Sequence, residues 1–199
     1  VWVMGGELSL GFSGLQGYQF GYIPPNRDIN FLDGMTAEAW IRPTGWGSMD
    51  DYGFGAIFHK NTISAYLHGT THADYNDHSL VAWIEHENGS RTRVCTESES
   101  IQLNAWQHLA LTYDPGLSEF RIFVNGDEQQ LTFLEEGSGE IRDDGSSSVL
   151  IGNVYYLDRT FDGRIDEIRF WNLVRTPAEL AHNQATRLSS HEPGLSAYY

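Results

Sequence analysis

The chain has only one cysteine, Cys95, among its 199 residues. No disulfide can form within it, and no CxxC motif for zinc or redox chemistry is present. No apolar stretch approaches the roughly 18 residues that a membrane helix needs, which argues against membrane insertion. Helical periodicity is nearly absent, and the apolar residues come in short runs instead. These absences favour a β-rich chain whose core forms without disulfides.

Basic residues are also scarce. Twelve Lys and Arg stand against 27 Asp and Glu, which gives a formal net charge of −15 at pH 7. Because this charge repels a phosphate backbone, we expect no nucleic-acid partner. The same charge suits a protein outside the cell, and it suits a site for Ca²⁺, which prefers oxygen ligands. With 40% hydrophobic residues, the chain can still fold as one domain.

Short runs rich in β-branched and aromatic residues alternate with Gly, Asn and Asp, as in antiparallel sheet proteins. One helix is predicted to begin after Thr176, which forms a capping-box pattern with Glu179, and to run to about residue 187. Turn residues predict three hairpins, at Asn88-Gly89, Asp114-Pro115-Gly116 and Asn125-Gly126. The predicted strands cover residues 7–12, 18–23, 35–42, 56–60, 63–67, 79–87, 91–96, 106–113, 119–125, 128–132, 149–151 and 163–171.

Six segments stand in a recognisable order: Leu8–Gly14, Met35–Pro43, Asn104–Asp114, Phe120–Gly126, Ile151–Asn153 and Phe161–Asn172. Together they resemble the LamG-like jelly roll of the concanavalin A-like lectin and glucanase superfamily. The resemblance implies an all-β fold class, a two-sheet antiparallel jelly-roll sandwich with one short helix near the C-terminus. It also implies that Trp40, Trp106 and Trp171, which lie in these segments, belong to the core. No single ligand follows from the fold.

We expect the jelly roll to span residues 1–190, followed by a C-terminal segment, 191–199. The end of that segment, Leu195–Tyr199, is similar to the strand that begins the next module in tandem LamG-like arrays. The chain also opens with Val1 rather than Met. We therefore expect one extracellular or cell-surface module with neighbouring modules in a longer chain.

A metal site is suggested by the resemblance. In this superfamily an acidic residue of the strand that corresponds to 163–171 often helps bind a structural Ca²⁺, and Asp166 is the candidate here, with Asp162 beside it. Alternation places Asp166 on the face of Ile168 and Phe170, where a buried carboxylate needs a partner. A cation would supply that partner, as would a backbone hydrogen bond or an arginine.

Three long polar connections, at residues 45–55, 69–78 and 137–148, are where we expect binding, because structureless loops of this length are usually functional. The first two combine acidic, histidine and aromatic side chains that could hold a glycan, a surface protein or a metal ion. An acidic, solvated loop with turn-forming residues is the alternative. The candidate ligand-binding residues in or beside these loops are Trp46, Asp50, Asp51, Tyr52, His72, Asp74, Tyr75, Asn76, Asp77 and Trp83.

The sequence therefore predicts a non-catalytic extracellular binding or adhesion module for a glycan or a cell-surface protein, with Ca²⁺ as the expected cofactor. A structural spacer in a multidomain surface protein is the alternative. Retaining glycoside hydrolysis needs two carboxylates about 5–5.5 Å apart. Glu85 and Glu87 alternate as such a pair would, but the glucanase pattern of Glu, apolar, Asp, apolar, Glu is absent. We expect no hydrolase activity.

Overall fold

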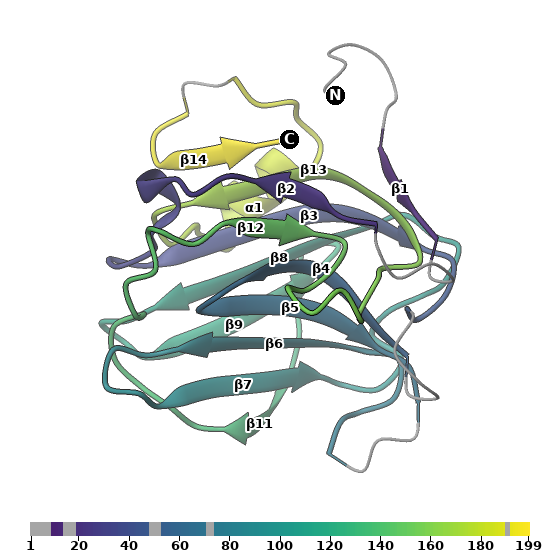
Figure 1. Ribbon diagram of the computed structural model, residues 1–199, viewed down its shortest axis with the longest axis horizontal. Coiled ribbons are helices and arrows are strands. Elements are labelled where there is room, and N and C mark those ends of the chain that lie inside the picture. Colours follow the sequence, from purple (N-terminus) through teal and green to yellow (C-terminus); the bar gives the residue numbers. More distant parts are fainter. Residues whose placement is uncertain (1–8, 14–18, 48–52, 71–73, 190–191) are drawn as a thin grey trace.

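The structure is a computed structural model that describes residues 9–13, 19–47, 53–70, 74–189 and 192–199. In this part of the chain, 14 strands form two antiparallel sheets of seven strands each. The sheets face each other as a sandwich, and one short helix lies outside it (Figure 1). The predicted all-β jelly-roll sandwich is confirmed.

Sheet A is organised around β13 and β3, whose pairing runs from Gly163 opposite Pro43 to Trp171 opposite Thr36. The last described strand, β14, also pairs with β13. In spatial order the strands of sheet A are β1 (Leu10–Phe12), β13 (Gly163–Trp171), β3 (Met35–Pro43), β8 (Gln107–Asp114), β9 (Glu119–Val124) and β10 (Asp127–Glu128), with β14 (Leu195–Tyr198) beside β13.

Sheet B faces the viewer in Figure 1. Its spatial order is β11 (Leu131–Glu135), β7 (Arg91–Thr96), β6 (Ser79–Glu85), β5 (Ile63–His68), β4 (Phe54–Lys60), β12 (Val149–Ile151) and β2 (Gly21–Ile23). A 3-10 turn, η1 (Arg27–Ile29), connects β2 to β3. The prediction of a single strand at residues 128–132 is wrong. In this segment the chain leaves β10 of sheet A and enters β11 of sheet B.

Turn chemistry places the three predicted hairpins correctly. Asn125 and Gly126 have φ angles of 53° and 87°, which a two-residue turn between antiparallel strands needs, and they join β9 to β10. The turn at residues 88–89 joins β6 to β7. Between β8 and β9, the carboxylate of Asp114 accepts the backbone N–H of Gly116 at 2.8 Å.

The helix α1 (Pro177–Gln184) has the predicted capping box. The hydroxyl of Thr176 accepts the N–H of Glu179, whose carboxylate accepts the N–H of Thr176 at 2.8 Å. The helix ends three residues before the predicted end. Arg169 of β13 donates to the carbonyl of Asn183 at 2.8 Å and so binds the C-terminal end of the helix.

The apolar core fills the space between the sheets. Its largest cluster draws on both, with Ile41 and Ile165 from sheet A and Leu67 and Ile84 from sheet B among its members. Trp171 is fully buried, as predicted, but it lies on the outer face of sheet A, where its indole N–H bonds to Glu38, and not between the sheets.

The prediction that Trp106 belongs to the core is wrong. Trp106 precedes β8 rather than lying within it, and its side chain is 40% exposed. The third predicted core tryptophan, Trp40, is half-buried and donates its indole N–H to the carbonyl of Gln184 at 3.1 Å.

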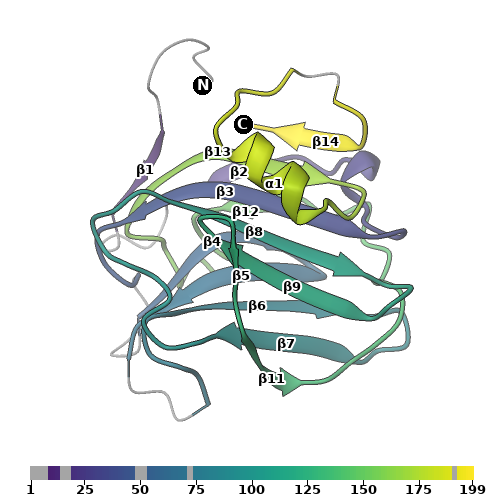
Figure 2. The same ribbon diagram turned by 180° about the vertical axis from the view of Figure 1, so that it is seen from behind.

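The outer face of sheet A is covered by the chain itself. The helix α1 lies across β3 and β8 (Figure 2), and its Leu180 packs against Ala110 and Phe123. At the edge, β14 takes part of segment 191–199 into this sheet, with Tyr198 paired opposite Arg169. The assignment of that segment to a following module stays a prediction.

Candidate functional site

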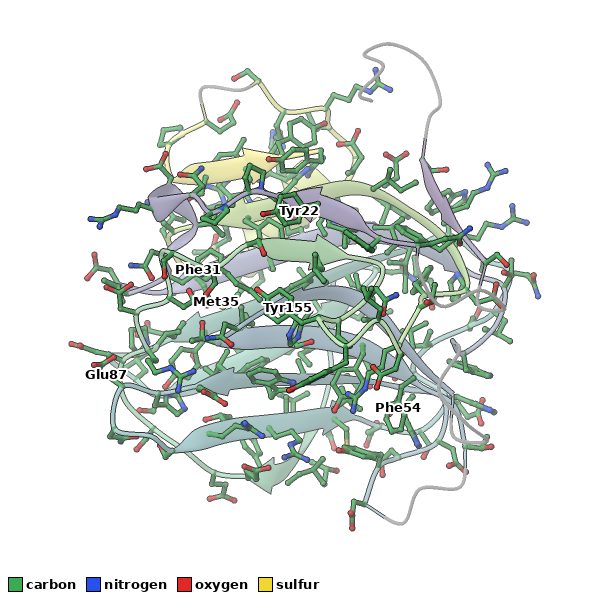
Figure 3. All side chains as sticks on the ribbon, viewed as in Figure 1. Tyr22, Phe31, Met35, Phe54, Glu87 and Tyr155 are labelled. Atoms are coloured by element: carbon green, nitrogen blue, oxygen red, sulfur yellow. The ribbon has the colours of Figure 1, made fainter. Side chains whose placement is uncertain are left out.

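The outer face of sheet B carries one continuous row of side chains that crosses six strands. Each member of the row is paired with the next across the sheet, and the even spacing of antiparallel strands aligns them on one face. Tyr22 and Tyr155 lie on this side of the molecule in Figure 3, with Phe54 toward one end of it. From β2 to β7 the row is Tyr22, Leu150, His59, Ser64, Trp83 and Arg93.

A pocket of about 260 Å³ opens on this row. Outward-facing side chains of β4, β5, β6 and β7 form the base of the pocket. The connection that follows β12 and the side chain of Tyr75 form its wall. The residues that line it are His59, Ser64, Tyr66, Tyr75, Trp83, Arg91, Arg93, Val154, Tyr156, Asp158 and Arg159.

Aromatic rings supply most of the apolar surface of the pocket. Trp83 is half-buried, and the edge of His59 approaches it with 6.0 Å between ring centroids. His59 in turn packs against Tyr155 at 4.6 Å. Tyr156, by contrast, is 90% exposed at the rim, so its ring offers an open face to a ligand.

Three guanidinium groups surround these rings. Arg91 lies 4.9 Å from the centroid of Trp83, and Arg159 lies 5.2 Å from the centroid of Tyr66. Arg93 donates to the hydroxyl of Tyr75 at 3.0 Å. The arginines are therefore held in defined positions by the aromatic side chains.

Charge in the pocket at neutral pH comes from the arginines and Asp158. Burial first, and then the charge of Arg159, lower the pKa of His59 to about 4, so its imidazole is neutral. Burial likewise raises the pKa of Tyr66, helped by its hydrogen bond with Tyr75. Neutral polar groups and cationic arginines thus face the same space.

The two loops predicted to bind ligand are in contact with each other. The ring of Trp46, from the first loop, stacks on His78 of the second with 4.6 Å between centroids and 10° between planes. Trp46 is half-buried and also packs against the core. Asn76 donates its side-chain amide to the carbonyl of Thr96 at 2.8 Å, which tethers the second loop to the end of β7. These contacts show a structural role for Trp46 and Asn76.

Of the six candidate ligand-binding residues that the structure describes, Tyr75 and Trp83 line the pocket and the other four do not. Asp74 and Asp77 lie exposed in the second loop. Four candidates lie outside the described residues, namely Asp50, Asp51, Tyr52 and His72. Binding of a ligand by the two loops stays a prediction.

The third polar loop is anchored to sheet B. Lys60, the only lysine of the chain, forms an ion pair with Asp144, and both side chains are almost fully buried. Asp144 also accepts the hydroxyl of Thr62 at 2.6 Å. Residues 137–148 are thereby fixed beside the turn from β4 to β5, which is a structural role.

The environment of Asp166 differs from the expected one. A bulge interrupts β13, with Glu167 at a φ of 49°, so the core residues Ile165 and Ile168 are three positions apart. Asp166 therefore lies on the opposite face from Ile168, and the expected shared face is wrong. Its carboxylate accepts the N–H of Glu167 at 2.9 Å.

Asp162 has a different role. Its carboxylate accepts the hydroxyl of Thr44 at 3.0 Å, and its carbonyl accepts the N–H of the same residue at 2.8 Å. Both aspartates thus have hydrogen-bond partners in the protein. Within the described residues, no group of three or more His, Cys, Asp or Glu side chains could hold a metal ion. Ca²⁺ binding at Asp162 and Asp166 stays a prediction.

Sequence reasoning missed most of the pocket. His59 and the three arginines come from β4, β7 and the connection after β12, which are far apart in the sequence. The available signal is the alternation within β7, where Arg91 and Arg93 share one face while Val94 belongs to the core.

The two glutamates considered for hydrolysis, Glu85 and Glu87, lie in different surroundings. Glu85 binds two arginines, Arg91 at 2.5 Å and Arg142 at 2.6 Å. Glu87 lies beyond the end of β6 and does not line the pocket. Among the lining residues that the structure describes, Asp158 is the one carboxylate.

The family model Laminin_G_3, described as the concanavalin A-like lectin/glucanases superfamily, matches residues 15–181. The chain belongs to this superfamily. No curated protein sequence is significantly similar to it. No described helix has the length and apolar character to cross a membrane.

Solved structures of this superfamily share the fold at low sequence identity. A protein of Bacteroides ovatus, provisionally described as carbohydrate binding, is 23% identical with a TM-score of 0.68, over 96% of this chain and 50% of its own. The chain thus spans half the length of that protein. A heptameric SAP-like pentraxin of Limulus polyphemus has 15% identity and a TM-score of 0.60, over 86% of this chain and 78% of its own.

A third similar structure is domain 4 of the extracellular GH43 arabinanase AbnA of Geobacillus stearothermophilus, determined in complex with arabinotriose. It is 17% identical with a TM-score of 0.50, over 89% of this chain and 81% of its own. At these identities the likeness shows the fold.

Proposed function

We propose that this chain is a non-catalytic, extracellular carbohydrate-binding module that holds a glycan on the outer face of sheet B. The observation that carries the proposal is the pocket around Trp83, where an exposed Tyr156 and polar side chains line one cavity. Binding sites for small ligands combine aromatic surface with a few placed polar groups in this way. The arabinotriose complex of the similar Geobacillus domain supports the choice of ligand.

The row of outward-facing side chains suits an extended glycan better than a single sugar. Five strand spacings separate Tyr22 from Arg93, which is roughly 24 Å. Tyr22 is 51% exposed and Tyr155 is 39% exposed, so aromatic surface continues beyond the pocket along the row. We therefore expect affinity to rise with chain length over several sugar units.

We propose a non-catalytic role because the described lining residues offer one carboxylate, Asp158, whereas retaining and inverting hydrolysis both need two. Glu85, the nearest alternative from the sequence, is neutralised by two arginines. A module that delivers or attaches its parent protein to a glycan, or to a glycosylated surface protein, needs no such pair.

Glycan-array binding of the purified chain tests the proposal. We expect Tyr156→Ala to weaken binding by about tenfold or more without changing the melting temperature, because the ring lines the pocket and is exposed to solvent. Trp106→Ala, an exposed tryptophan outside the pocket, is the matched control and keeps full affinity. No bound glycan, or binding that neither Tyr156→Ala nor Trp83→Ala reduces, would overturn the proposal.

We propose separately that Asp166 is a ligand of a bound Ca²⁺ ion. A cation that binds only the folded state adds about 2.7 kcal/mol of stability at a hundredfold excess over its dissociation constant. Melting with added Ca²⁺ and with a chelator would show that rise in the wild type and not in Asp166→Ala. Equal melting temperatures with Ca²⁺ and with chelator would show that the folded chain does not bind Ca²⁺.

A further inference from the structure

The pocket is a local concentration of positive charge on an acidic protein. The chain has 12 basic and 27 acidic residues, yet three arginines and one carboxylate line this cavity. Arg91 and Arg93 come from β7, and Arg159 comes from the connection after β12. Among the described lining residues basic side chains thus outnumber acidic ones, the reverse of the balance in the whole chain.

Acidic residues around the pocket balance this charge only in part. Glu85 is shared between Arg91 and Arg142, so two guanidinium groups have one carboxylate between them. Arg93 pairs with Glu135, whose side chain is 39% exposed to water. The imidazole of His59 is neutral, because burial and Arg159 lower its pKa to about 4.

The guanidinium groups are also positioned for recognition. Arg91 and Arg159 lie over aromatic rings, which hold their planes fixed, and the Nε atoms of Arg91 and Arg93 are buried without a hydrogen-bond partner. A planar guanidinium presents paired donors whose spacing matches two oxygens of one oxyanion. A preformed arrangement of this kind lowers the ordering cost of binding.

We propose that the pocket recognises a sugar that carries an oxyanion, either a ring carboxylate or a sulfate ester, through Arg91, Arg93 and Arg159. This inference rests on the proposed function, because it names the class of glycan that the same site takes. The sugar ring packs against the aromatic side chains while its anionic group meets the arginines. Neutral glycans bind the same surface more weakly.

Two matched pairs of polymers test the charge requirement. Polygalacturonate and its carboxyl-reduced form share a backbone and differ in carboxylate, and dextran sulfate and dextran differ in sulfate ester. We expect the wild type to bind at least one charged polymer about tenfold or more tightly than its neutral counterpart. The pair that shows the preference identifies the anionic group.

Substitution of the arginines tests whether the pocket is responsible. Arg159→Gln and Arg91→Gln are expected to reduce the ratio of the affinity for the charged polymer to the affinity for its neutral counterpart. Arg159→Lys is expected to keep part of that ratio, since lysine has the charge but not the paired donors of a guanidinium. Arg121→Gln is the matched control, because Arg121 pairs with Glu128 and lies 5.0 Å from the ring of Phe123 on the other sheet. It keeps the wild-type ratio.

The outcomes of these experiments separate the anionic preference from glycan binding itself. Glycan-array binding confined to neutral glycans, or a charge preference that Arg159→Gln and Arg91→Gln leave intact, overturns the inference and leaves the proposed function standing. An array on which no glycan binds overturns the proposed function and the inference together.

Discussion

On the outer face of sheet A the chain covers its own arginine, histidine and tryptophan side chains, whereas on the outer face of sheet B the same residue types surround a pocket. Glu38, in the middle of sheet A, is 2% exposed and accepts the indole N–H of Trp171 at 2.7 Å. His108 lies 3.1 Å from its other oxygen. The side chains of Glu38, Trp171 and His108 are thus buried against one another.

The difference lies in what covers each face. Over sheet A, α1 and the residues that follow it supply carbonyl groups to Arg169, which is 1% exposed. Over sheet B, loops leave a cavity in which Trp83 and the arginines remain partly exposed. The same residue types therefore form a structural cluster on one face and line a pocket on the other. The two faces differ in whether another part of the chain covers these side chains.

The largest expected effect is on the covered face. Arg169→Met leaves the carboxylates of Glu38 and Glu167 without a buried cation and removes the contact with α1, so we expect a loss of about 3–5 kcal/mol in the free energy of unfolding. Arg93→Met, in the pocket, should cost about 1–2 kcal/mol because water reaches its partners. Urea unfolding of both variants measures this, and equal losses would break the comparison.

A smaller effect concerns pH and the pocket histidine. Because the pKa of His59 is lowered from 6.5 to about 4 by burial and by Arg159, the unfolded chain binds a proton there that the folded chain does not. Stability is therefore complete above pH 6.5 and falls as the pH drops toward 4.

His59→Asn tests this assignment. We expect the loss of unfolding free energy between pH 7.5 and about 4.5 to be smaller in the variant by about 1–2 kcal/mol. His182→Asn, an exposed histidine of α1, is the matched control and keeps the wild-type slope. An unchanged slope in His59→Asn would contradict the buried, neutral state of this imidazole.

The smallest predicted effect concerns the helix that covers sheet A. Thr176→Ala removes the hydroxyl that accepts the N–H of Glu179 and should cost about 1 kcal/mol, whereas Thr176→Ser keeps the cap. Faster hydrogen exchange of the Trp40 indole N–H, which bonds to the carbonyl of Gln184, would report loosening of the cover. Glycan affinity should not change, since the helix lies on the other sheet.

Most of the fold follows from local patterns in the sequence. Alternation and turn residues place the hairpins, and the capping box of Thr176 and Glu179 places the helix. The bulge in β13 does not follow, because Glu167 adopts a positive φ without being glycine. That one residue moves Asp166 to the face opposite the expected one.

The site follows from the sequence only in part. Trp83 and Tyr75 are among the predicted binding residues, since exposed aromatic side chains near loops suggest a ligand. Their neighbours Arg93 and His59 become recognisable only through the strand order, in which β4, β5, β6 and β7 are adjacent. Pairing between distant strands sets that order, and a single sequence does not display it.

The most direct test of the central claim is a titration followed through the tryptophan indole N–H signals in ¹H–¹⁵N spectra. Trigalacturonate serves as the acidic probe and galactotriose as the neutral one. If the glycan binds on sheet B, the Trp83 signal shifts with at least one of them, while the signals of Trp171, bonded to Glu38, and of the exposed Trp106 do not. A shift at Trp46 with none at Trp83 would contradict the account and place the site in the loops.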